Sequence, residues 1–355
     1  MDDATPEGHL HGPWIDIHGH PGRCFLGGLD AGSPLVQLLG GDEAAVRVGS
    51  ASAGEVSVVA AASVADLAVL GMNDEGGLYA ERQFAPGEAA ADHGRQLAAI
   101  QALAAMHDVE LVLGCDDIPG GDLGRTGVLV TCEGGDFLDG RLEGLEVAYG
   151  QGVRSVTLVH YRVNELGDIQ TDDAVHGGLT GFGREVVREM NRLGMIVDLA
   201  HATFDATVQA LEESSAPLMI SHSHLAGRGA DHPRLLTEEH ARVVASAGGL
   251  IGAWPTGIVM ETLDDFCDEI CRLIDLVGLG HVAIGTDLDA NYRPVLTSYE
   301  QFPEVAAGLA RRGMTSTEVD RVLGGNFLDL FGVVEAGGLG RSNSPRRQGR
   351  SRINR

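Results

Sequence analysis

The sequence predicts an α/β protein in which a closed parallel sheet is surrounded by helices, a (β/α)8 or TIM-type barrel. Short, continuously apolar runs alternate with helical segments, and about eight such units fit into the 355 residues. Strands of a parallel sheet are buried on both faces, so they are apolar throughout. In addition, several runs end in a histidine or a carboxylate, and the carboxyl ends of barrel strands share one face.

The expected strands and helices alternate along the chain. The expected strands are a run from Trp14 into His18, then 56–60, a short one at 110–113, and 128–132, 153–159, 195–200, 218–221, 250–254 and 281–286. The expected helices are 93–107, 141–149, 181–193, 204–213, 237–247, 263–277, 299–312 and 317–331. Thr237 is a good N-cap, with Glu238 and Glu239 in the first turn.

An open, doubly wound sheet is the alternative fold. Such sheets usually carry a glycine fingerprint after the first strand, and residues 19–28 do not match GxGxxG. Residues 21–28 are expected to form a glycine-rich loop, and residues 29–54 give no clear pattern. We expect one barrel domain over residues 1–336 and a disordered, Arg-rich tail over 337–355.

Composition narrows the class of protein. The net charge of -26 argues against a nucleic-acid surface, which needs a basic face. The acidic N-terminus lacks the profile of a signal peptide, and the apolar stretch 56–72 is interrupted by Ser63 and Asp66, so it falls short of a membrane span. The five cysteines are scattered and include no CxxC pair. We therefore expect a cytoplasmic protein with no membrane partner, and the sequence is compatible with a homodimer.

A histidine pair and four distant residues suggest a metal centre. His18 and His20 are two apart at a strand end, so both imidazoles reach one point. The other strand-end groups are Glu133, His201, His222 and Asp287. Six groups exceed the three protein ligands of a mononuclear catalytic zinc, which favours two metals. The chain contains no lysine to serve as a carbamylated bridge, so Glu133 is the candidate bridging ligand.

A series of motifs then carries a family resemblance. They lie in the same order as in the family, at 16–20, 133–135, 158–161 with Asn164 and Asp168, 177–183, 197–201, 221–223, 231–234, 285–289 and 324–327. The chain resembles the renal, or membrane, dipeptidase family of zinc metallopeptidases, within the amidohydrolase superfamily. The resemblance covers about residues 14 to 331, and the ordered series is far more specific than two histidines alone.

The resemblance implies hydrolysis of dipeptides, with tolerance for a D-residue at the C-terminal position, by two zinc ions that share a glutamate. Carried over by position, His18, His20 and Glu133 would hold one ion, and Glu133, His201 and His222 the other. His160 matches the residue that polarises the scissile carbonyl. Arg234 matches the arginine that binds the substrate carboxylate, and Asp287 matches the general acid/base, with Asp289 as the alternative.

The sequence departs from the family pattern in two places. The first motif is His-x-His where the family usually has His-x-Asp, which removes one negative charge and favours ionisation of a metal-bound water. Leu235 follows Arg234 where asparagine is usual, and the spacing from His222 is one residue longer. Metal-dependent hydrolysis is therefore predicted more firmly than the substrate.

Three other functions compete with the dipeptidase interpretation. A metal-dependent nuclease can share this order of ligands, but the acidic charge argues against it. The second is hydrolysis of another small amide, lactam or ester in a biosynthetic pathway. A non-catalytic binding protein is the third, and it is disfavoured because every catalytic position is filled. The remaining histidines are expected to be structural or solvated, although His224 and His232 are close enough in the sequence to the site residues to line the site.

Overall fold

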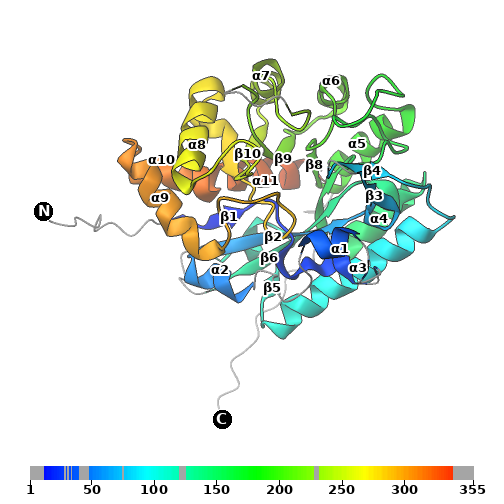
Figure 1. Ribbon diagram of the computed structural model, residues 1–355, viewed down its shortest axis with the longest axis horizontal. Helices are drawn as coiled ribbons and strands as arrows, with labels where there is room; N and C mark the ends of the chain where they lie inside the picture. The colour runs from blue at the N-terminus through cyan, green and yellow to red at the C-terminus, as the bar shows by residue number, and fades with distance from the viewer. Residues whose placement is uncertain are drawn as a thin grey trace, which may run out of the picture.

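The structure is a computed structural model that describes residues 12–27, 29, 32, 34–39, 48–73, 76–119, 125–227 and 232–338. In it, eight parallel strands close into a barrel, because β2 pairs with β1 on one side and with β6 on the other (Figure 1). In order around the ring the strands are β1 (Trp14–Asp16), β2 (Val56–Val64), β6 (Gly127–Glu133), β7 (Val153–Thr157), β8 (Ile196–Asp198), β9 (Met219–Ser223), β10 (Leu250–Ala253) and β11 (Val282–Ile284). The predicted (β/α)8 fold is confirmed.

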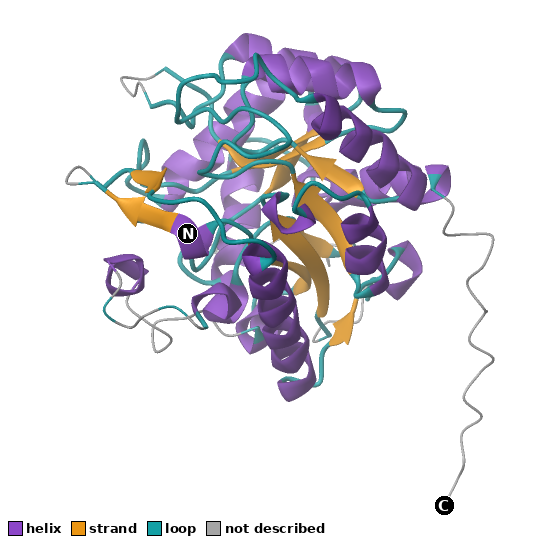
Figure 2. Cartoon of the chain, turned by 90° about the vertical axis from the view of Figure 1, so that its right-hand side faces the viewer, coloured by secondary structure: helices purple, strands orange, loops and turns teal. Residues whose placement is uncertain are grey.

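Helices cover the outside of the barrel (Figure 2). They are α1 (Pro34–Leu39), α2 (Gly49–Ala53), α3 (Glu88–Met106), α4 (Glu143–Gly150), α5 (Gly181–Leu193), α6 (Phe204–Glu213), α7 (Glu238–Ser246), α8 (Leu263–Val277), α9 (Phe302–Arg311) and α10 (Ser316–Asp320). The largest buried cluster lies between these helices and the strands. None of the helices in the described ranges is both long and apolar enough to cross a lipid bilayer.

A second cluster fills the barrel itself and is closed by the last helix, α11 (Asn326–Gly337). Phe327 and Phe331 of α11 pack against inward-facing residues such as Ile15 and Ile196. The end of α11 lies beside Gly194, just before β8 begins, so this helix plugs the amino ends of the strands. The opposite, carboxyl ends are left for polar side chains.

The carboxyl end is partly covered by short elements. The 3-10 helix η1 (Pro21–Leu26) follows β1, and the antiparallel hairpin of β3 (Leu70–Met72) and β4 (Leu78–Ala80) follows β2. Phe25, Leu70 and Leu78 belong to one small apolar cluster that also includes Tyr161. This cluster forms a cap beside the mouth of the barrel.

The element predictions are accurate where the periodicity is strong. Helices α5, α6 and α8 have the predicted bounds, and Thr237 caps α7 by accepting a hydrogen bond from the His240 N–H. The strand at 110–113 is shorter, β5 (Glu110–Leu111), and pairs only with β6. The segment 21–28, expected as a loop, contains η1. The small elements α1, α2 and the β3–β4 hairpin were not predicted.

The two helices expected near the C-terminus are interrupted. The first begins as a 3-10 turn, η7 (Tyr299–Gln301), before α9. The second is divided by a π turn, η8 (Arg321–Gly325), between α10 and α11. At Gly324 a side chain would collide with the Pro13 carbonyl, because its Cβ would lie 1.9 Å from that oxygen. The single-domain division at residue 336 stays a prediction, and residues 339–355 of the expected tail lie outside the described residues.

Candidate metal centre

The structure brings the predicted strand-end residues to one end of the barrel. His18 and His20 follow β1, Glu133 is the last residue of β6, and His222 lies in β9. Three more follow β7, β8 and β11, namely His160, His201 and Asp287. All seven residues are buried, with exposed fractions between 1% and 7%.

Glu133 lies at the centre of the group. Five Nε2 atoms approach its two oxygens: those of His201 at 3.0 Å, His20 at 3.4 Å, His18 and His222 at 3.5 Å, and His160 at 3.6 Å. After Glu133 the chain must turn sharply, and Gly134 adopts φ 93° there with Ala65 packed against it. Glycine takes this left-handed conformation without the steric cost of a Cβ.

Two overlapping sets of donor atoms are suited to metal ions. One consists of His18, His20 and Glu133, and the other of Glu133, His201 and His222; within each set the ligand atoms lie within 4.8 Å of one another. Imidazole nitrogens and a carboxylate are the donors that zinc takes in catalytic sites. The Nε2 atoms of His18 and His20 are buried without a hydrogen-bond partner among the described residues, so they point at a shared space. The residues therefore form two overlapping candidate sites for a divalent ion, and Glu133 belongs to both.

Contacts behind the rings fix their orientation. His20 Nδ1 lies 3.1 Å from the Ala62 carbonyl oxygen, and His222 Nδ1 lies 3.0 Å from Ser221 Oγ. Each of these rings therefore turns its Nε2 inward. Partners of this kind set the tautomer and raise the basicity of ligating histidines.

The electrostatic environment differs from one ligand to the next. Burial alone would raise the pKa of Glu133, but His160, His18 and His20 hold that pKa well below its usual range. Burial, together with Arg234 and His160, holds the pKa of His201 well below its usual range, and burial together with His18 does the same for His222. Conversely, the nearby carboxylates of Asp287 and Glu133 outweigh burial at His20 and raise its pKa to about 10.

Asp287 faces the same space from β11. Its Oδ1 lies 3.3 Å from His20 Nε2, and its Oδ2 accepts a hydrogen bond of 3.2 Å from Trp254 Nε1. Asp287 and His201 both have left-handed backbones, at φ 54° and 66°. Non-glycine residues pay about 1–2 kcal/mol for that conformation, and such strain is concentrated at functional sites.

Arg234 is also brought to this centre. Its side chain is only 1% exposed, which argues against a surface ion pair, and Asp231 lies outside the described residues. Nη1 donates to Gln170 Oε1 at 2.6 Å and Nη2 lies 3.1 Å from His222 Nε2. Nε is buried with no hydrogen-bond partner among the described residues. The guanidinium thus faces the centre with donor capacity available for an anion.

Two buried aspartates beneath the ligands were missed in the sequence. Asp16 Oδ1 accepts hydrogen bonds from the backbone N–H groups of His18 and Thr286, the residue before Asp287. Asp198 Oδ1 likewise accepts from the N–H of Ser221, the residue before His222. Each carboxylate therefore ties one strand end to the next. A signal was available, since both aspartates lie two or three residues before a candidate histidine.

Two further residues near the site were missed, and both lie at strand ends that contribute none of the predicted residues. Asp66, just beyond β2, contacts His160, and Trp254, just beyond β10, contacts Asp287 and lies 5.5 Å from the Arg234 guanidinium. Every strand of the barrel thus supplies a side chain to this end. Trp254 is the last residue of the predicted strand 250–254, so a scan of strand ends would have found it, whereas Asp66 lies beyond the predicted strand 56–60, because β2 extends to Val64.

The other histidines have different surroundings. His224 faces Glu269 and the Leu225 carbonyl, so it does not join the centre, whereas His232 Nδ1 accepts the Arg234 N–H. His9 and His11 lie outside the described residues. Asp289, the alternative acid, instead accepts a hydrogen bond from the Gly22 N–H.

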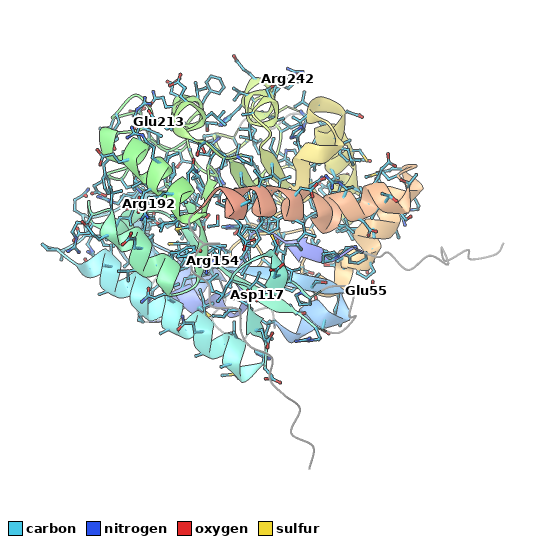
Figure 3. The ribbon with its side chains drawn as sticks, turned by 180° about the vertical axis from the view of Figure 1, so that it is seen from behind. Glu55, Asp117, Arg154, Arg192, Glu213 and Arg242 are labelled. Carbon is cyan, nitrogen blue, oxygen red and sulfur yellow. The ribbon has the colours of Figure 1, made fainter. Side chains whose placement is uncertain are left out.

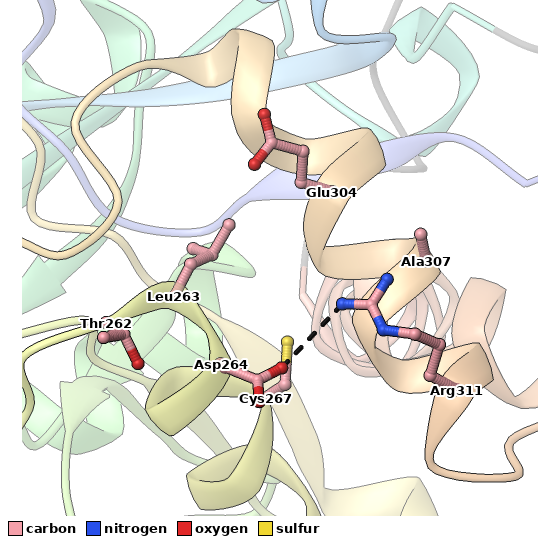
Figure 4. A pocket seen from close by; sticks show the side chains of 7 residues that line it. All are labelled: Thr262, Leu263, Asp264, Cys267, Glu304, Ala307 and Arg311. Carbon is pink, nitrogen blue, oxygen red and sulfur yellow. Dashed lines mark ion pairs between the residues drawn. The ribbon is translucent and has the colours of Figure 1, made fainter.

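A second hollow among the described residues lies away from the metal centre. A cavity of about 400 Å³ lies between α8 and α9 and shares no residue with the metal centre (Figure 4). Its Asp264 is paired with Arg311 and Arg312. On the outer helices, Arg192 and Arg242 (Figure 3) and Arg188 all form ion pairs with glutamates, which leaves these arginines without the free charge of a nucleic-acid groove.

The fold and this cluster define a class, a (β/α)8 barrel with a candidate two-metal centre at the carboxyl ends of its strands. Residues 54–344 match the family described as membrane dipeptidase, peptidase family M19. The chain belongs to this family, and the predicted resemblance is confirmed. His18 and His20 precede the matched region, and in the structure their Nε2 atoms lie 3.5 Å and 3.4 Å from the Glu133 oxygens.

Named relatives agree with this family. Dipeptidase tcpJ of Claviceps purpurea is 33% identical over 221 residues, which are 60% of this chain and 52% of the relative. An uncharacterized dipeptidase of Schizosaccharomyces pombe, C3A11.10c, is 34% identical over 197 residues, which are 53% of this chain and 48% of the relative. The chain thus spans about half the length of the curated relatives that it matches.

Two solved structures share the fold over nearly the whole chain. An amidohydrolase from Pseudomonas aeruginosa superimposes with a TM-score of 0.72 at 21% identity, covering 92% of this chain and 98% of that one. A metallo peptidase from Rhodobacter sphaeroides, liganded with a phosphinate mimic of the dipeptide L-Ala-D-Ala, gives a TM-score of 0.71 at 17% identity, covering 91% and 99%. At these identities the two structures support the fold.

Proposed function

We propose that this protein is a zinc-dependent dipeptidase that hydrolyses small dipeptides, including those with a C-terminal D-residue. The observation that carries the proposal is the convergence of five histidine Nε2 atoms on the buried carboxylate of Glu133. Membership of the membrane dipeptidase family supports the reaction class. The Rhodobacter structure, which holds a dipeptide mimic, supports the type of substrate.

The proposed metal ligands are divided between two ions. His18 and His20 would hold one, His201 and His222 the other, and Glu133 would bind both. When bound, such a pair of divalent ions supplies a water of lowered pKa and polarises the scissile carbonyl. Zinc is the proposed metal because the donors are imidazole nitrogens and one carboxylate.

Asp287 is the proposed general acid and base. Its Oδ1 faces the space between the ligands, while its Oδ2 is held by Trp254, so the free oxygen is aimed by a fixed contact. Asp287 would take the proton of the attacking water and deliver it to the leaving amine. Such proton transfers contribute typically 10²–10⁴-fold to a rate.

His160 and Arg234 are the proposed substrate contacts. His160 Nε2 faces the centre and would donate a hydrogen bond to the carbonyl oxygen as negative charge develops there. Arg234 would bind the free carboxylate of the dipeptide, since its guanidinium is buried beside the ligands and retains a donor without a described partner. Together the two contacts would place the peptide bond between the acid and the ligands.

A substrate panel on the zinc-reconstituted protein tests the proposal. The panel contains L,L dipeptides, L-Ala-D-Ala, the same dipeptides with a blocked amine or an amidated carboxyl group, a lactam, a simple ester and single-stranded DNA. We expect the free dipeptides to have the highest kcat/KM. Preference for the lactam, ester or blocked substrates would instead identify the amidohydrolase-type alternative, and cleavage of DNA would identify a nuclease.

A further inference from the structure

Asp66, which follows strand β2, is aimed at His160. Its Oδ1 lies 2.6 Å from His160 Nδ1, and its Oδ2 accepts a hydrogen bond of 2.9 Å from the Tyr161 N–H. The side chain is fully buried. Both carboxylate oxygens are therefore engaged by two consecutive residues of the loop that follows β7.

The backbone leading to Asp66 is held on both sides. The Gln96 side chain accepts from the Val64 N–H at 2.7 Å and donates to the Val64 carbonyl at 2.9 Å. The Ala65 N–H donates to the Glu133 carbonyl at 2.8 Å. The position of the Asp66 carboxylate is thus fixed relative to the central glutamate.

The two nitrogens of His160 consequently have different roles. A carboxylate only accepts hydrogen bonds, so the proton between Asp66 and His160 belongs to Nδ1. The opposite nitrogen, Nε2, lies 3.6 Å from Glu133 Oε2 and faces the centre. We propose that Asp66 is a positioning residue, which keeps the proton on His160 Nδ1 and aims Nε2 at the reacting carbonyl. The kinetic part of this inference rests on the proposed dipeptidase function.

Asp136 provides a matched control in the same region. It is buried, accepts hydrogen bonds from Arg162 at 2.6 Å and Asn164 at 3.1 Å, and has no hydrogen bond to His160 in the structure. A carboxylate that only stabilises the loop should behave like Asp136. Substitution of a positioning residue should also change which nitrogen of the His160 ring carries the proton.

The experiment compares Asp66→Asn with Asp136→Asn in zinc-loaded protein labelled with ¹⁵N-histidine. The Nδ1–H resonance of His160 is assigned by its absence in His160→Gln. We expect this resonance in the unaltered protein and in Asp136→Asn, and its loss or movement to Nε2 in Asp66→Asn. With a dipeptide substrate, Asp66→Asn should lower kcat by about 10–100-fold, with KM and zinc content nearly unchanged.

An Asp66→Asn protein that retains the Nδ1–H resonance would overturn the inference, whatever its kcat. If Asp66→Asn does not fold, Asp66→Glu serves as the second variant, because it keeps the charge but moves the carboxylate. The same spectrum and the same kinetics are measured. An unchanged Nδ1–H resonance and an unchanged kcat would show that the position of the Asp66 carboxylate does not matter, which would contradict the inference. If the unaltered zinc-loaded protein cleaves no dipeptide, the proposed function fails. The spectrum still decides the role of Asp66 in that case.

Discussion

Two groups of histidines in this barrel are equally buried but have different surroundings. The mouth histidines are His18, His20, His160, His201 and His222, and the helix-layer histidines are His93 and His240. All are at most 7% exposed. Every mouth histidine places its Nε2 within 3.6 Å of Glu133. By contrast, the ring nitrogens of His93 and His240 contact uncharged groups: His93 Nδ1 lies 3.2 Å from Ser63 Oγ and 3.6 Å from Cys132 Sγ, and His240 Nε2 lies 2.8 Å from Thr207 Oγ1.

The difference shows that burial alone does not mark a ligand. Burial lowers the pKa of both helix-layer histidines to about 4, because no charged neighbour opposes it. At the mouth, neighbouring charges move pKa values in both directions, up for His20 and down for His222. Convergence on a shared carboxylate distinguishes a candidate metal centre from histidines that fill a core.

The largest effect is expected from removing the proposed proton carrier at the mouth. Asp287→Asn keeps the size and the contact to Trp254 but loses the basic oxygen. In zinc-loaded protein, kcat for a dipeptide should fall by about 10²–10⁴-fold with unchanged zinc content. The matched control is Asp289→Asn, which should keep kcat within a few-fold. Equal effects of the two substitutions would contradict the assignment.

Substitution of Arg234 should weaken substrate binding at the mouth without removing a proposed metal ligand. Arg234→Ala should raise KM about 10–100-fold for dipeptides with a free carboxylate, since a hydrogen bond to a charged group contributes roughly 1.5–3 kcal/mol. Dipeptides with an amidated carboxyl group should change much less. Steady-state kinetics on the two substrate forms measures this, and an identical loss for both would argue against a carboxylate contact.

The helix-layer histidines should affect stability instead of activity. The His93 pKa is lowered from 6.5 to about 4, so the unfolded chain binds more protons between these values and stability falls as the pH decreases. Between pH 7 and pH 5, His93 should account for about 2 kcal/mol of lost unfolding free energy. Urea unfolding of His93→Gln should show that much less pH dependence, with unchanged zinc content. An unchanged pH dependence would show that His93 does not titrate this way.

The smallest effect is expected at Trp254. Trp254→Phe removes the hydrogen bond that the indole donates to Asp287 Oδ2 but keeps an aromatic ring near Arg234. A loss of about 1 kcal/mol for one hydrogen bond corresponds to roughly fivefold in kcat. Kinetics over a pH range measures it, and a loss as large as that of Asp287→Asn would mean that the indole does more than orient the carboxylate.

The sequence predicted the barrel because apolar strands and amphipathic helices have strong local signatures. The bounds of helices α5, α6 and α8 were predicted correctly. Short elements such as α2 and β4 were missed, because their form depends on packing against the barrel. The π turn at 321–325 was also missed, and the close approach of the Pro13 carbonyl to Gly324 is a contact between residues distant in the chain.

The sequence predicted the candidate site residues more completely than the residues that orient them. His18, Glu133, His201 and the other strand-end residues were recognised because barrel topology brings strand ends together. Asp66 was noted only as an interruption in an apolar stretch, since its partner His160 lies 94 positions further along the chain. Which carboxylate orients which ring depends on side-chain geometry that spacing in the sequence does not encode.

The central claim, that Glu133 is shared by two ions, is tested most directly by metal analysis. The unaltered chain and Glu133→Gln would be reconstituted with zinc, dialysed, and measured by inductively coupled plasma mass spectrometry. The account predicts about two zinc ions per chain for the unaltered protein and less than one for Glu133→Gln. No bound zinc in the unaltered protein, or two ions retained by Glu133→Gln, would contradict it.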